Sequence, residues 1–208
     1  MNNSIQYIVI LLICFALCVY MAVFALLHTK RDKVRSYYVH FVYAIAGQCL
    51  FDLIWKFSEG RTIRANTVFS YTVNILYFIC AMLMAYFWFL YSEKIQGSHK
   101  TRMERTISLV VFNVPFAFLF ILILTTSITH KVFYIQNGIY HRGDLYILTV
   151  IIPAVYIVYT SVKALVRLSQ KKYYIMRVVN LFISLYAVIL LIFQTTQIIT
   201  NGESNKQP

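Results

Sequence analysis

The segment from Phe133 to Tyr159, FYIQNGIYHRGDLYILTVIIPAVYIVY, contains the join that decides the fold. It begins as a polar, aromatic-rich connection, IQNGIYHRGD, and after Asp144 it continues as a long apolar run. Such a join is typical of a loop that lies on a membrane surface and leads into a helix that crosses the bilayer. We therefore expect this loop, together with the helix ends around it, to be the place where an external signal is sensed.

The composition indicates a membrane protein. Hydrophobic residues make up 60% of the 208 residues and charged residues only 12%, against roughly half and a quarter in soluble domains. The basic residues, which give a formal net charge of +12, lie in short clusters between apolar runs. Such clusters are typical of topology signals that face anionic lipid, whereas a nucleic-acid module carries its basic residues along one soluble face. We expect the lipid bilayer, and no nucleic acid, as a partner.

Six stretches contain the roughly 20 predominantly apolar residues that a membrane-spanning helix needs. No linker or low-complexity segment separates them, so residues 1–208 are predicted to form a single domain. The predicted fold class is all-α, a polytopic bundle of six transmembrane helices at residues 5–27, 37–57, 70–92, 107–127, 145–168 and 178–200.

The distribution of Lys and Arg predicts the orientation of this bundle. Cytoplasmic connections carry an excess of these residues, which places the N-terminus and, after six crossings, the C-terminus outside the cell membrane. Thirteen of the 19 basic residues lie in or beside the first, third and fifth connections: Lys30, Arg31, Lys33, Arg35, Lys94, Lys100, Arg102, Arg105, Lys163, Arg167, Lys171, Lys172 and Arg177.

The sequence contains no pattern typical of an enzyme, a metal site or a cofactor site. The four cysteines all lie inside apolar runs, where free Cys behaves as a small hydrophobe, so no disulfide and no metal are predicted. The five histidines are scattered, and seven acidic residues offer no paired carboxylate motif. We expect a protein that is not itself an enzyme.

Polar side chains at membrane depth are costly and usually face the interior of a helix bundle. Asp52, close enough in sequence to pair with Lys56 at i, i+4, and Gln48 are predicted in the outer half of the second helix. These groups either form an outward-open pocket for a small ligand or hydrogen-bond one another between helices. For the pocket, the candidate ligand-binding residues are Asp52, Trp55, Asn74, His141, Arg142, Gln194 and Gln197.

Three phrases resemble the N-terminal membrane sensor of bacterial, mostly Firmicute, GGDEF-type diguanylate cyclases and related signalling proteins. They are FDLIWKFSEG at residues 51–60, NILYFICAMLMAYFWFLYSEKI at 74–95 and FYIQNGIYHRGDLY at 133–146. In that family a comparable I-Y-H-R-G phrase follows a short aromatic hairpin. The resemblance implies a seven-helix sensor whose last helix leads into a cytoplasmic catalytic domain. It implies no binding residues, because the family's ligands are mostly undefined.

This chain departs from the family in having six predicted helices and no GGDEF signature. We therefore expect a sensory module, either a truncated or split sensor or a stand-alone relative that acts through a membrane signalling partner or a homodimer. The alternative is a small solute transporter or the substrate-capture subunit of an importer, for which an outward polar pocket would serve equally well.

Overall fold

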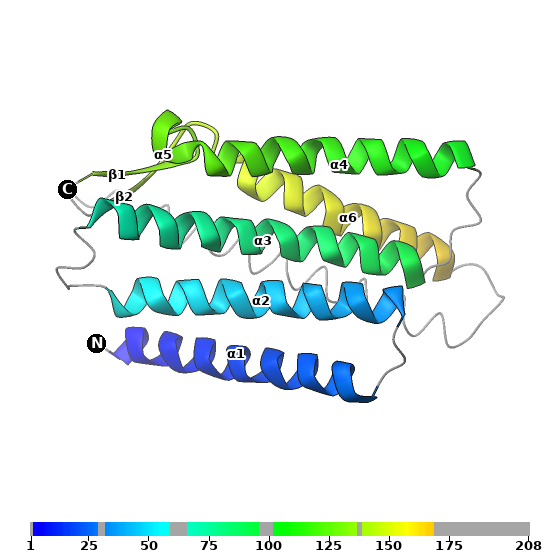
Figure 1. The fold of residues 1–208 in the computed structure, drawn as a ribbon, viewed down its shortest axis with the longest axis horizontal. Helices are drawn as coiled ribbons and strands as arrows, with labels where there is room; N and C mark the ends of the chain where they lie inside the picture. Colours follow the sequence, from blue (N-terminus) through cyan, green and yellow to red (C-terminus); the bar gives the residue numbers. More distant parts are fainter. Residues whose placement is uncertain (1, 29–31, 59–65, 96–101, 137–138, 169–208) are drawn as a thin grey trace.

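The computed structural model describes residues 2–28, 32–58, 66–95, 102–136 and 139–168. Within these residues the fold is helical apart from one two-stranded hairpin (Figure 1). In chain order the elements are α1 (Asn2–His28), α2 (Lys33–Phe57), α3 (Thr67–Ile95), α4 (Arg102–Leu124), α5 (Thr126–Thr129), β1 (Phe133–Gln136), β2 (Ile139–Arg142) and α6 (Leu148–Leu168).

The long helices run up and down along one axis, and α3 lies at the centre. Helices α1, α2 and α3 lie side by side in chain order, while α4 and the obliquely placed α6 cover the far side of α3 (Figure 1). The hairpin and α5 lie at the end of the bundle where α1 begins. We call this the hairpin end, and the end where α1 finishes the opposite end.

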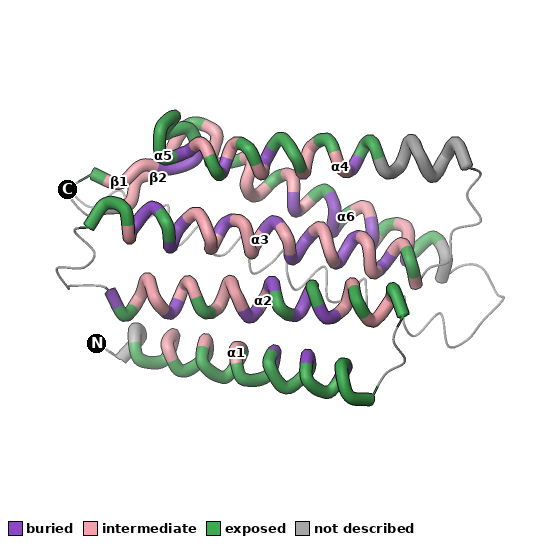
Figure 2. The backbone as a smooth tube through the Cα atoms, viewed as in Figure 1, coloured by how far each residue is buried: buried purple, intermediate pink, exposed green. Residues whose placement is uncertain are grey.

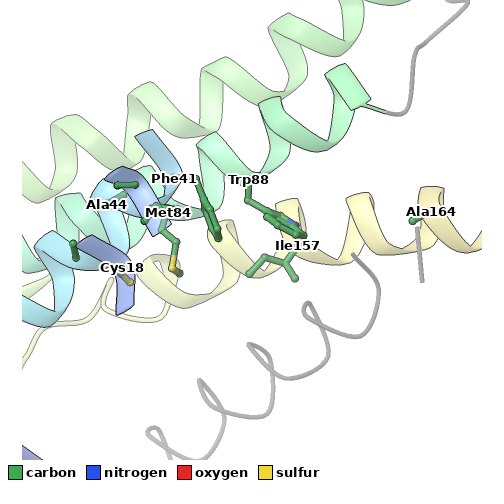
Figure 3. Close-up of a cluster of buried hydrophobic side chains, with 10 residues drawn as sticks. Cys18, Phe41, Ala44, Met84, Trp88, Ile157 and Ala164 are labelled. Carbon is green, nitrogen blue, oxygen red and sulfur yellow. The ribbon is translucent and has the colours of Figure 1, made fainter. Parts of the chain in front are cut away.

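Helix α3 carries buried residues along its whole length, whereas most of α1 is exposed (Figure 2). One core cluster joins α1, α2, α3 and α6, and in it the rings of Phe41 and Trp88 lie 5.2 Å apart against Ile157 (Figure 3). The fold therefore places α3 between the first two helices and the last two, in contact with both pairs.

Among the described residues, four helices are long and apolar enough to cross a membrane, judged by length and composition: Ile5–His28, Lys33–Phe57, Thr67–Ile95 and Leu148–Val166. In α4 the apolar part described is shorter, Val110–Leu124. Large apolar side chains on the outer faces are exposed, for example Leu27 in α1 and Val114 in α4. Contiguous apolar surface of this kind needs a lipid or protein environment. The membrane class predicted from composition is thus supported by the fold.

Helices occur at five of the six predicted spans, and four of these five are long and apolar enough to cross a membrane. The sixth predicted span, at 178–200, lies outside the described residues. The helix predicted at 107–127 ends at Leu124, where Thr125 adopts φ of −85° and ψ of −1° and the chain turns into α5. The helix predicted from residue 145 begins at Leu148, after a turn in which the Leu148 N–H donates to the Leu145 carbonyl. The predicted surface loop contains an antiparallel hairpin.

Gly47 allows α2 and α3 to approach closely. A Cβ at this position would lie 2.8 Å from the Cys80 sulfur, inside the normal contact distance. We expect Gly47→Val to lower the free energy of unfolding by about 1–2 kcal/mol, because added bulk strains a packed interface. Adding Cys80→Ala should recover part of the loss, since it removes the clashing sulfur. Thermal unfolding of the detergent-solubilised variants measures both effects, and equal melting temperatures for wild type and Gly47→Val would contradict the prediction.

Candidate functional site at the hairpin end

The hairpin presents two different faces. Its register pairs Phe133 with Arg142 and Tyr134 with His141, and side chains alternate between faces along each strand. Phe133 is fully buried among residues of α3 and α4, so the face it shares with Arg142 is directed at the helices. On the other face the rings of Tyr134 and His141 stack at 5.0 Å. His141 and Arg142 are adjacent in sequence, but they belong to opposite faces.

Tyr71 of α3 fastens the hairpin to the helical bundle. Its hydroxyl lies 3.0 Å from Nδ1 of His130 and accepts the backbone N–H of Ile135 at 3.3 Å. Its ring stacks on Phe133 with a centroid distance of 5.5 Å. One side chain therefore contacts the turn before the hairpin, its first strand and the buried aromatic cluster beneath it.

Thr126 and Gly143 close the loop around the hairpin. The buried Thr126 hydroxyl accepts the N–H groups of Val132 and Phe133, each at 3.2 Å, and lies 3.2 Å from the Phe133 carbonyl. The Gly143 N–H donates to the Val132 carbonyl at 2.8 Å. These bonds satisfy backbone groups that burial would otherwise leave unpaired.

Arg142 connects the hairpin to the turn that leads into α6. Its guanidinium lies 4.6 Å from the centroid of the Tyr146 ring, within the range of a cation–π contact. Tyr146 also meets Phe78 of α3 edge-on at 6.0 Å. Beside it, burial raises the pKa of Tyr140 above the usual value for tyrosine, and the neighbouring Tyr146 adds to this effect. The Tyr140 hydroxyl is therefore neutral at physiological pH and remains a hydrogen-bond donor.

Asp52 forms a second polar cluster at the hairpin end, between α1 and α2. The Tyr7 hydroxyl donates to its Oδ2 atom. The Lys56 ammonium lies 5.7 Å from the centroid of the Tyr7 ring. The sequence predicted Lys56 as the partner of Asp52, and the contact that it missed is the one from Tyr7, 45 residues away. Trp55, half-buried on the same helix, accepts the Ser58 hydroxyl at its carbonyl at 2.7 Å.

The side-chain amides of Asn74 and Gln48 each donate a hydrogen bond, the first within its own helix and the second to a neighbouring helix. The buried Asn74 amide donates to the Ser70 carbonyl of its own helix at 2.8 Å. One turn deeper than Asp52, the Gln48 amide donates to the Tyr77 hydroxyl at 3.3 Å. This bond joins α2 to α3 beside the Asp52 cluster.

The structure thus brings some of the predicted site residues to one end of the bundle and separates others. Asp52 and Trp55 share α2, Arg142 faces the helices, and His141 lies on the outer face of the hairpin. Gln194 and Gln197 lie outside the described residues. Sequence reasoning missed the connecting tyrosines at positions 7, 71 and 77, because aromatic residues near helix ends are equally typical of an interfacial belt.

No metal site is present in the part of the chain that the structure describes, where no three His, Cys, Asp or Glu side chains gather closely enough to hold an ion. Comparison of the chain with protein-family models, with curated proteins and with solved structures finds no match.

Proposed function

We propose that the protein is an integral plasma-membrane sensory module of six transmembrane helices, with its N-terminus and hairpin outside the cell. The module is not itself an enzyme. It binds a small extracytoplasmic or membrane-borne ligand at the hairpin end and transmits the change to a membrane signalling partner or to a second copy of the chain.

The orientation rests on the positions of the basic residues. The described ends of α2, α3 and α6 that lie away from the hairpin carry Lys33, Arg35, Lys94 and Lys163. Under the positive-inside rule these ends face the cytoplasm, which puts the hairpin outside. The Lys and Arg distribution of the whole sequence predicts the same orientation.

The observation that carries the proposal is the attachment of the hairpin to two helices that run the length of the bundle. Tyr71 joins it to α3. Arg142 contacts Tyr146 in the turn before α6, and the Tyr146 carbonyl accepts the Thr149 hydroxyl of α6 at 2.7 Å. A ligand that prefers one position of the hairpin would therefore favour one arrangement of these helices, in proportion to its differential affinity for the two states.

A chimeric cyclase tests the proposal even while the ligand is unidentified. Residues 1–200 are joined to the seventh helix and catalytic domain of a GGDEF-type diguanylate cyclase, and cyclic di-GMP is measured in cells. Because Arg142→Ala removes the contact with the turn that leads into α6, we expect it to change cyclase output by about fivefold or more, the usual lower range of coupling between sites.

Lys131→Ala is the matched control for this experiment. It removes one cation from the same end, but Lys131 is exposed and its pair with Asp144, at 3.8 Å, is also exposed, so output should stay near wild type. Equal output from wild type, Arg142→Ala and Lys131→Ala would contradict the sensory role. Solute uptake by proteoliposomes that contain the unmodified chain would instead favour the transporter alternative.

A further inference from the structure

His130 is the residue at which the chain turns from α5 into the hairpin. Its backbone N–H donates to the Thr126 carbonyl at 2.8 Å. Among the described residues other than glycine, it alone has a positive φ, of 55°. This fixed backbone sets the position of the imidazole, and because the residue is exposed, protons from the aqueous phase reach the ring.

His130 ends a chain of hydrogen bonds that holds the hairpin to α3. The Ile135 N–H of β1 donates to the Tyr71 hydroxyl at 3.3 Å, and that hydroxyl lies 3.0 Å from Nδ1 of His130. Because the Tyr71 oxygen already accepts the Ile135 N–H, its own proton is available to donate to Nδ1. Nδ1 accepts this bond only in the neutral imidazole, since both ring nitrogens are donors in the charged form.

Protonation of His130 disrupts this order of donors and acceptors. With a proton on Nδ1, two donors meet at the Tyr71 oxygen, and the Tyr71 proton no longer has Nδ1 as its acceptor. The attached hairpin therefore takes up a proton less readily than the detached hairpin. A fall in pH through the range in which histidine ordinarily titrates, about pH 5 to 8, then favours detachment.

The charged and titratable side chains around His130 act in the same direction. The next residue, Lys131, is cationic, and its pair with Asp144 at 3.8 Å is exposed. The Tyr134 ring of β1 lies edge-on to the His130 ring at 6.3 Å and stacks on His141 of β2 at 5.0 Å. In acid, two charged imidazoles thus flank one tyrosine ring close to a lysine, and like charges repel.

We infer that His130 is a proton-binding residue of the sensory site, which fastens the hairpin to α3 through Tyr71 when neutral and releases it when protonated. The extracytoplasmic proton is then one of the signals that the module senses. This last step rests on the proposed function, whereas release of the hairpin in acid is a property of the chain itself.

Hydrogen exchange of the full chain in lipid nanodiscs measures the attachment at about pH 7.5 and about pH 5.5, on either side of the ordinary titration of histidine. The readout is the protection factor of the Ile135 amide, from which the intrinsic pH dependence of amide exchange cancels. We expect protection to be about fivefold lower at the lower pH, the change that loss of one net hydrogen bond produces.

His130→Asn and His141→Asn form the matched pair of variants. Asparagine tolerates a left-handed backbone and offers a carbonyl oxygen as acceptor, but it does not titrate, so protection in His130→Asn should be independent of pH. Protection should still fall in acid in His141→Asn, because the contact of that imidazole with Tyr134 lies within the hairpin. Tyr71→Phe keeps the ring against Phe133 without the hydroxyl, so protection should be low at both pH values.

Four outcomes would overturn the inference. They are equal protection of the wild type at the two pH values, higher protection at the lower pH, an acid-induced fall that persists in His130→Asn, and loss of the fall in His141→Asn as well as in His130→Asn. The last would indicate a general effect of charge on the hairpin.

The chimeric cyclase distinguishes failure of this inference from failure of the proposed function. If protection of the wild type falls in acid while cyclase output stays constant in every variant, the sensory role is wrong and the proton-dependent attachment stands. If output responds to Arg142→Ala while protection does not depend on pH, the sensory role stands and the proton is not its signal.

Discussion

Replacing Gly143 by alanine is expected to detach the hairpin from the bundle. A Cβ at this position would lie 2.3 Å from the Lys131 carbonyl oxygen and 2.5 Å from that of His130. Both are backbone atoms, so no rotamer change relieves the contact. Two further features lie beside this contact. The Gly143 N–H donates a hydrogen bond to the Val132 carbonyl, and His130 has a left-handed backbone with φ of 55°.

The expected cost of Gly143→Ala is about 3 kcal/mol, the upper part of the range for overpacked sites, because neither neighbouring carbonyl can move freely. Hydrogen exchange of the chain in lipid nanodiscs measures the effect as lost protection of the backbone amides at residues 132–145. Asp144→Ala is the control, because its side chain is 89% exposed and an exposed ion pair contributes at most about 1 kcal/mol. Unchanged protection in Gly143→Ala would show that the loop is not held as described.

The helices were predictable from sequence because each is a long apolar run, and five of the predicted positions are found in the structure. Their ends were less predictable, since they depend on contacts made only in the folded chain. Thr126 illustrates this: its hydroxyl binds backbone groups of Val132 and Phe133, and nothing in the local sequence distinguishes it from Thr125 or Thr129.

The candidate site was predictable in its location but not in its contacts. Asp52 was identified because a carboxylate at membrane depth is costly, but its bond from Tyr7 depends on how α1 packs on α2. His141 and Arg142 were grouped by adjacency, whereas strand alternation directs them to opposite faces. Asn74 donates from its amide to the Ser70 carbonyl of its own helix, a contact that the polarity of the position alone does not predict.

A cavity of about 560 Å³ at the opposite end of the bundle had no sequence signal of its own. It requires Tyr20, Arg35 and Tyr91 from three different helices to meet, and each of these residues alone is typical of a membrane interface. A cavity between helices is a property of their packing, which residue spacing within one helix does not determine.

The second large effect is expected at the ion pair between Glu93 of α3 and Lys163 of α6. The two side chains are in direct contact, only 18% and 15% exposed, and the Lys163 ammonium also lies 5.9 Å from the centroid of the Tyr159 ring. Glu93→Ala removes the counter-charge from a largely buried lysine, and breaking such a pair costs about 3–5 kcal/mol. We expect a clear fall in the melting temperature of Glu93→Ala in detergent.

The double variant Glu93→Leu with Lys163→Met distinguishes the contribution of the two charges from that of the packing of the two side chains. Apolar side chains of similar volume can replace a buried pair at little cost, so the double variant should be much more stable than Glu93→Ala. Equal destabilisation of the single and double variants would mean that packing, not charge, dominates at this contact.

If the pair acts as expected, α3 and α6 are fixed to each other at the opposite end while Tyr71 and Arg142 join both to the hairpin. A displacement of the hairpin would then be carried to the opposite end by two helices that move together.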